Sequence, residues 1–78
     1  MIFEKVKEII IETISVEEEK VTKEARLYED LEADSLDAVE LVMALEEAYG
    51  IHIDDEELSQ LKTVEDIVKT IEAQTKEQ

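Results

Sequence analysis

Apolar residues recur at helical spacing along this 78-residue chain, and very little in the sequence would interrupt a helix. The chain has no proline and a single glycine, and it is rich in Glu, Lys, Leu, Ile and Val. Such a composition favours helices over sheets. A chain of this length forms one small domain with a limited core. The sequence therefore predicts one all-α domain that covers residues 1–78.

Four stretches of the chain show the pattern of a helix. The first spans residues 2–14, where apolar side chains fall on one face of a helical period. The second extends from about Ser35 to Tyr49, and Gly50 behind it suits a left-handed C-cap. Acidic residues 54–57 begin a short third helix, and a capping-box pattern at residues 63–66 opens the last one. The expected fold is a small antiparallel four-helix bundle with three main helices and one short helix.

Between the first two helices, residues 15–33 lack a sustained period. Connections this long inside a compact domain are usually functional or disordered. Leu27, Tyr28 and Leu31 are the side chains expected to anchor this segment to the core. At the other end of the chain, residues 75–78 are expected to fray.

The second helix carries apolar residues on two sides. At the helical rotation of about 100° per residue, one side forms the core stripe, which consists of Ala38, Leu41, Val42, Leu45, Ala48 and Tyr49. The opposite side holds a second apolar group with carboxylates around it: Leu36, Val39 and Met43, with Glu40 and Glu47 beside them and Glu46 on the flank. Scattered exposed apolar residues are ordinary. An apolar strip bordered by carboxylates is nevertheless typical of a docking surface, and methionine suits one that must fit several partners.

Acidic residues are concentrated in the middle of the chain, whose net charge is −15. From Leu27 to Leu61 there are twelve Asp and Glu and no Lys or Arg, while five basic residues precede this window and three follow it. This arrangement argues against nucleic acid as a partner, because phosphate binding needs Lys and Arg. It favours protein partners with basic patches, which would be attracted by electrostatic steering.

The residues that are missing from the chain narrow the function further. No cysteine is present, which excludes disulfides and Cys-ligated zinc and leaves the chain without a thiol. No apolar run is long enough to insert into a membrane, and no signal peptide pattern opens the chain, so we expect a soluble cytoplasmic monomer. Two groups of carboxylates, at residues 29–37 and 46–57, lack the spacing of an EF-hand and predict at most weak Ca²⁺ or Mg²⁺ binding, with no metal site.

Ser35 lies where the irregular acidic segment ends and the second helix begins, and either Asp34 or Ser35 could cap that helix. A serine at such a position is usually only a cap. Two facts favour another role: helix N-termini stabilise an attached phosphate, and the chain offers no partners for an activated nucleophile, since it has one His and no Cys. We therefore interpret Ser35 as an acceptor that another enzyme modifies, and we expect no catalytic residues and no enzyme activity.

Residues 30–47, with the sequence DLEADSLDAVELVMALEE, resemble the modification site of acyl carrier proteins, above all the free-standing carriers of dissociated fatty acid synthesis. The resemblance implies a helical bundle of that family's type, with 4′-phosphopantetheine attached to Ser35 between Asp34 and Leu36. A phosphopantetheinyl transferase would supply this group from coenzyme A with Mg²⁺. The thiol of the group would then hold acyl chains as thioesters while fatty acid synthesis enzymes act on them.

The same resemblance assigns roles to both sides of the second helix. Partner enzymes with basic patches are expected to dock on Leu36, Asp37, Val39, Glu40, Met43, Glu46 and Glu47. A growing acyl chain is expected to shelter among ten apolar core positions, which are Val6, Leu27, Leu41, Val42, Leu45, Ile53, Leu61, Ile67, Val68 and Ile71.

Two positions depart from the family pattern: Glu32 stands where many members have glycine, and Asp54 stands where proline is common. Two alternatives to a fatty acid carrier remain open. One is a specialised carrier of the polyketide type, and the other is a small acidic interaction module that carries no such group.

Overall fold

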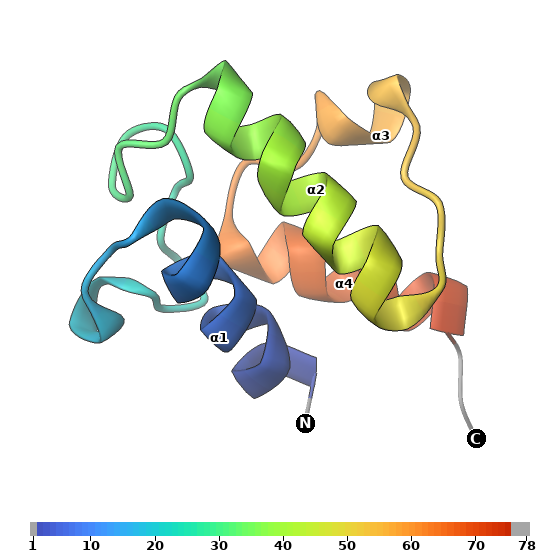
Figure 1. Cartoon of the computed structure of the whole chain (residues 1–78), viewed down its shortest axis with the longest axis horizontal. Helices are drawn as coiled ribbons and strands as arrows, with labels where there is room; N and C mark the ends of the chain where they lie inside the picture. Colours follow the sequence, from blue (N-terminus) through green and yellow to red (C-terminus); the bar gives the residue numbers. More distant parts are fainter. Residues whose placement is uncertain (1, 76–78) are drawn as a thin grey trace.

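A computed structural model describes residues 2–75 of the chain (Figure 1). Helix α1 spans Ile2–Ile14, α2 spans Ser35–Tyr49, α3 spans Asp55–Leu58 and α4 spans Val64–Thr75. A short 3-10 helix, η1, covers Glu18–Lys20, and no strand occurs within the described residues. The predicted all-α fold, with three main helices and one short helix, is confirmed. Thr75 is still helical, and the fraying predicted beyond it lies outside the described residues.

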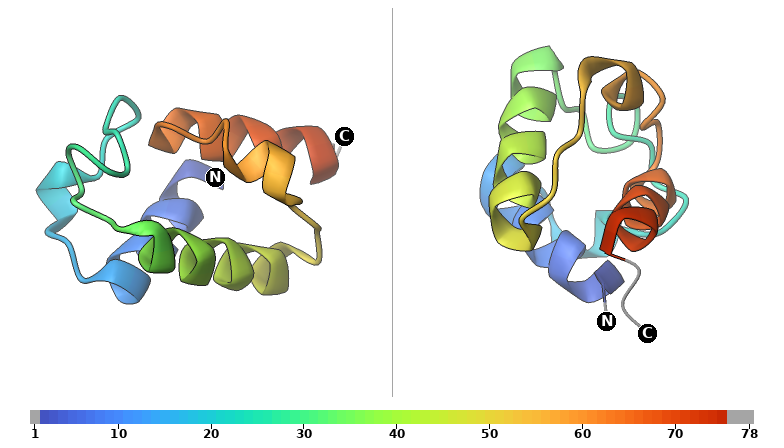
Figure 2. Two further views of the ribbon diagram at one scale, coloured as in Figure 1. Left: turned by 90° about the horizontal axis from the view of Figure 1, so that it is seen from above. Right: turned by 90° about the vertical axis from the view of Figure 1, so that its right-hand side faces the viewer.

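The three main helices surround one core (Figures 1 and 2). Helix α1 packs against both α2 and α4 and runs against their direction, whereas α2 and α4 run the same way. The short α3 lies on the side of the molecule away from α1 (Figure 2). The arrangement leaves one face of α2 directed outward, because α1, α3 and α4 all lie to its other sides.

The core is one apolar cluster built from the inner faces of the helices and from the connections between them. All ten positions predicted to shelter an acyl chain are buried in it, from Val6 on α1 to Ile71 on α4. Four of the six residues of the predicted α2 stripe are buried, and Tyr49 is half-buried. The prediction for Ala48 is wrong, since this residue is exposed. It lies at the edge of the stripe in the last turn of α2, close to where the chain leaves the helix.

The long connection before α2 is ordered and packs on the core. Its middle forms an isolated bridge with the α3–α4 connection, in which Leu27 N–H donates to the Lys62 carbonyl (3.0 Å) and Val64 N–H donates to the Ala25 carbonyl (3.0 Å). Five of its side chains are buried, which are Val21, Ala25, Leu27, Leu31 and Ala33. Of the three side chains expected to anchor this segment, Leu27 and Leu31 are buried, whereas Tyr28 is 51% exposed, so the prediction for Tyr28 is wrong. Residues 27–30 form a turn that buries Leu27 and leaves Tyr28 exposed.

Local capping explains where the later helices begin and end. Gly50 adopts the left-handed conformation (φ 64°) that was expected at the C-cap of α2. Asp54 caps α3, with its side chain accepting from Glu57 N–H at 3.0 Å. At the start of α4, the Thr63 hydroxyl accepts from Asp66 N–H at 3.2 Å, and the Asp66 carboxylate accepts from Thr63 N–H at 3.2 Å. This reciprocal pair is the capping box predicted from the sequence.

Candidate functional site

The start of α2 presents Ser35 to solvent. The N-cap is Asp34, whose Oδ1 accepts from Asp37 N–H at 2.8 Å while Asp37 Oδ2 accepts from Asp34 N–H at 3.3 Å. This capping box satisfies the helix terminus without the serine. Ser35 is exposed, and no hydrogen bond joins its side chain to any other residue in the described part of the chain. Of the two caps that the sequence allowed, the structure selects Asp34 and leaves the Ser35 hydroxyl accessible.

The approach to Ser35 contains a backbone conformation that favours glycine. Glu32 has a φ of 59°, in the left-handed region, between the buried side chains of Leu31 and Ala33. A residue with a Cβ pays about 1–2 kcal/mol in this region, whereas glycine adopts it freely. Glu32 therefore occupies a position with the backbone geometry of a glycine, in line with the departure noted in the sequence. The side chain of Glu32 is exposed three residues before Ser35.

A tight turn organised by Asp30 precedes this position. The Asp30 carboxylate accepts from Arg26 N–H at 2.8 Å, and the Arg26 carbonyl accepts from the backbone N–H of Asp30 (2.9 Å) and of Leu31 (3.0 Å). The Arg26 guanidinium forms ion pairs with Glu29 and Asp30. The backbone hydrogen bond from Arg26 has the largest effect and lowers the pKa of Asp30. Desolvation, the second largest effect, opposes it, and the charge and side-chain hydrogen bond of Arg26 lower the pKa further. These contacts hold the turn that leads the chain to Ser35.

The outer face of α2 is apolar at its centre and acidic around it. Leu36 is 64% exposed and Met43 is 61% exposed, and Val39 between them is exposed as well. Glu40 and Glu47 are also exposed, and Asp37 is partly so. No Lys or Arg occurs in α2, so the face carries one sign of charge. The predicted exposure of this surface is confirmed, while its contact with partners stays a prediction.

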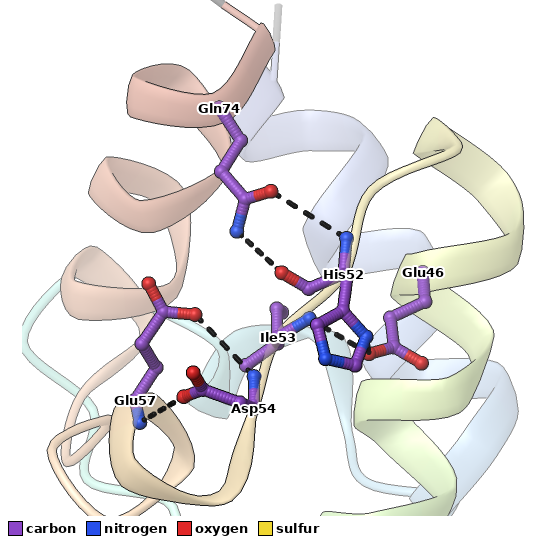
Figure 3. A network of polar contacts seen from close by, with 6 residues as sticks. All are labelled: Glu46, His52, Ile53, Asp54, Glu57 and Gln74. Atoms are coloured by element: carbon purple, nitrogen blue, oxygen red, sulfur yellow. Dashed lines mark hydrogen bonds and ion pairs between the residues drawn. The ribbon is translucent and has the colours of Figure 1, made fainter.

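Glu46 differs from the other predicted docking residues, because its carboxylate is already engaged (Figure 3). Its side chain is only 26% exposed, and Oε2 accepts from Ile53 N–H at 2.7 Å. His52 Nδ1 lies 3.5 Å from the same oxygen. No sequence pattern predicts this contact, which joins α2 to the segment beyond Gly50.

Two recesses flank the short helix α3. One, of about 240 Å³, opens between α2 and α3 and is lined by Val39, Val42, Met43, Glu46, His52, Ile53, Asp55 and Leu58. The other, of about 640 Å³, lies between α3 and the turn before α2 and is lined by Arg26, Tyr28, Glu29, Asp55, Leu58, Ser59, Leu61 and Lys62. Leu58 and Asp55 belong to both linings, so α3 forms the wall between the recesses. Of the ten predicted shelter residues, Val42 and Ile53 line the first recess and Leu61 lines the second.

Residues 2–75 contain neither a metal-binding cluster nor a membrane-spanning helix. No group of three or more His, Asp or Glu in this part of the chain could hold a metal ion. None of its helices is both long and apolar enough to cross a membrane.

Residues 4–71 match a family model described as a phosphopantetheine attachment site. The acyl carrier protein of Helicobacter hepaticus is 56% identical over 71 residues, which cover 91% of this chain and 93% of the relative. The chain belongs to the acyl carrier protein family. The acyl carrier protein of Thermosynechococcus vestitus is 57% identical over 90% of this chain and 86% of its own length, and that of Petrotoga mobilis is 53% identical over 90% and 82%. As a member of this family, the chain holds a covalently attached 4′-phosphopantetheine group.

Proposed function

We propose that this chain carries acyl groups as thioesters on 4′-phosphopantetheine attached to Ser35, in fatty acid biosynthesis in the cytoplasm. One observation carries the choice of Ser35: Asp34 caps α2, so the serine hydroxyl is exposed and is not needed to close the helix. Family membership supports the nature of the group. The hydroxyl is the acceptor: with Mg²⁺, a phosphopantetheinyl transferase joins the Ser35 oxygen to the phosphopantetheine phosphate of coenzyme A. The pyrophosphate bond breaks, adenosine 3′,5′-bisphosphate leaves, and the hydroxyl proton is released.

The residues around Ser35 fit an attached phosphodiester. Ser35 is the first residue of a four-turn helix, where the aligned peptide dipoles favour a negative group. The neighbouring carboxylates of Asp34 and Asp37 oppose that charge. Each of them accepts a backbone N–H of the capping box, which partly offsets the repulsion.

The group supplies a terminal thiol, which forms the thioester with an acyl chain and which this cysteine-free chain cannot provide itself. The residues of the chain orient and tether that thiol. We assign them no part in bond making, because Ser35 has neither a histidine nor a second nucleophile beside it in the sequence motif. The protein is thus a carrier on which other enzymes act.

The outer face of α2 is the surface on which those enzymes dock. Leu36, Val39 and Met43 supply apolar contact area, and the surrounding carboxylates steer partners that have basic patches. Asp34 and Leu36 flank the acceptor and meet the transferase. The partners are the transferase and the enzymes of fatty acid synthesis. The carrier is a monomer when they bind it.

The shelter for an acyl chain consists of the ten buried positions named above, which form part of one continuous cluster. A packed core has little free volume, so an acyl chain enters by displacing side chains. Val42 and Ile53 are core residues that also line the recess between α2 and α3, which makes this recess the place where displacement begins.

Acyl loading tests the proposal. Incubation with an acyl-coenzyme A, Mg²⁺ and a broad-specificity transferase should add one acyl-phosphopantetheine to the mass of the chain, and the Ser35→Ala variant should gain nothing. Neutral hydroxylamine cleaves thioesters, so it should remove the acyl mass and leave the phosphopantetheine. An acyl group that survives hydroxylamine, or one that loads on Ser35→Ala, would show that the group is held in another way.

A further inference from the structure

The segment that joins α2 to α3, residues 51–54, lies outside both helices, yet every one of its backbone N–H groups is bonded. Figure 3 shows the bonds of residues 52–54. We call it the linker. Three of the four acceptors are side-chain oxygens. Ile51 N–H donates to the Glu46 carbonyl (3.2 Å), His52 N–H to Gln74 Oε1 (3.5 Å), Ile53 N–H to Glu46 Oε2 (2.7 Å) and Asp54 N–H to Glu57 Oε1 (3.4 Å).

Two of the side-chain contacts are short, and both come from the main helices. The bond from Ile53 N–H to the Glu46 carboxylate is 2.7 Å long, within the range of strong bonds to a charged acceptor. Gln74 Nε2 donates to the His52 carbonyl at 2.6 Å. The remaining side-chain bonds, at 3.4–3.5 Å, exceed the usual length of a good hydrogen bond. Glu46 on α2 and Gln74 on α4 therefore hold the linker from two sides.

Apart from these tethers, few side chains hold this part of the molecule to the core, and the linker residue Ile51 is only partly buried there. Helix α3 has only four residues, and none of them is buried. A single helical turn is unstable without outside contacts, and Leu58 packs only partly against the core, between the two recesses. Ile53 in the linker and Leu61 after α3 are the buried anchors on either side. Regions with so few buried apolar contacts are the ones that open locally.

We propose that Glu46 and Gln74 form a latch that controls how often the linker lifts away from the core. When the latch is closed, Ile53 stays buried and α3 stays over the recess between α2 and α3. Release of either contact lets the linker and α3 move together and opens that recess to an apolar chain. Glu46 is thus a positioning residue for the linker. Only the consequence for an acyl chain rests on the proposed function, because the latch belongs to the unmodified protein.

Hydrogen exchange at the Ile53 amide tests the closed latch. In a Ser35→Ala background, where no modification occurs, Glu46→Ala should speed exchange at Ile53 about tenfold to hundredfold. Loss of a hydrogen bond to a charged group lowers the free energy of local opening by an amount that corresponds to this factor. Glu46→Gln keeps an acceptor oxygen and should show a smaller increase, and Gln74→Ala should also speed exchange at Ile53. Glu47→Ala is the matched control, since this neighbouring carboxylate is exposed and holds no linker amide.

Thiol labelling tests the opening itself, and the absence of cysteine from the chain makes a single introduced thiol specific. A thiol at Leu61→Cys measures opening beside α3, and a thiol at Val6→Cys measures opening in α1. Both positions are buried. Glu46→Ala should speed labelling at position 61 at least about tenfold and leave position 6 unchanged. Equal acceleration at both positions would mean general destabilisation, and no acceleration at position 61, or Ile53 exchange equal to that of Glu47→Ala, would mean that no latch exists. Any of these results overturns the proposal.

Discussion

The two faces of α2 are built from similar residues and have opposite environments. On the inner face Leu41, Val42 and Leu45 are buried against the other helices, and on the outer face Leu36, Val39 and Met43 are exposed. Full burial of such a side chain contributes about 1.5–3 kcal/mol to folding, and the outer residues gain little of it. Folding therefore explains the inner face only. We propose that the outer face serves binding to partner proteins.

The largest expected difference between the faces is in stability. Leu45 is fully buried, so Leu45→Ala should lower the free energy of unfolding by about 2–5 kcal/mol through lost burial and a cavity. Met43→Ala, two residues earlier on the exposed side, should change it by less than about 0.5 kcal/mol. Urea unfolding of the two variants measures both values. Similar losses for both would break the comparison.

Charge reversal tests the binding role of the outer face. In the Glu40→Lys and Glu47→Lys double variant, modification of Ser35 by the transferase should slow about tenfold at moderate ionic strength, because rim charges control association. The matched control reverses Glu8 and Glu12, which lie exposed on α1 and change the net charge equally. If both double variants slow alike, net charge is responsible, and if neither slows, α2 is not the docking surface.

Backbone substitutions at the two ends of α2 should have opposite signs. Glu32→Gly removes the strain of a left-handed residue and should stabilise the fold by about 0.5–1 kcal/mol, after allowance for the greater flexibility of unfolded glycine. Gly50→Ala should destabilise it by about 1 kcal/mol, although no atom lies within 4 Å of the added Cβ. Thermal unfolding of both variants checks the signs. A destabilising Glu32→Gly would mean that the carboxylate makes a favourable contribution that outweighs the strain.

The smallest effect concerns Asp30 and depends on pH. Because the Arg26 N–H lowers the pKa of Asp30 in the folded chain, ionised Asp30 stabilises the fold above the unfolded pKa of about 3.8, and this contribution is lost as the pH falls through the folded value. Asp30→Asn should therefore lower Tm slightly at pH 7. The difference from the original chain should begin to shrink as the pH falls below the ordinary pKa of aspartate, about 4. A difference that does not shrink on acidification while the chain stays folded would contradict the role of the charge.

The helices and their caps could be predicted from the sequence because their signals are local. The period of residues 2–14, the glycine after α2 and the Thr63–Asp66 pair each act within a few residues, and the structure confirms them. Tyr28 was placed wrongly because its environment depends on the bridge to the α3–α4 connection, more than thirty residues away. Local sequence carries no information about that pairing.

At the candidate site, too, local features were predicted from the sequence and long-range contacts were not. The exposed outer face followed from helical geometry, and the Asp34–Ser35–Leu36 motif pointed to the acceptor. The choice between Asp34 and Ser35 as cap depends on the backbone geometry at the start of α2, since both residues are good caps. The inward contact of Glu46 could not be predicted either, because its partner Ile53 lies beyond the turn at Gly50, and the second tether from Gln74 comes from another helix.

The intact mass of the unmodified chain after incubation with coenzyme A, Mg²⁺ and a broad-specificity phosphopantetheinyl transferase tests the central claim most directly. Ser35→Ala should be measured beside it, with Ser59→Ala as the control for another exposed serine. The account predicts a gain of one phosphopantetheine in the original chain and in Ser59→Ala, and none in Ser35→Ala. A folded chain that gains nothing, or a Ser35→Ala variant that is still modified, would contradict the assignment of Ser35 as the attachment site.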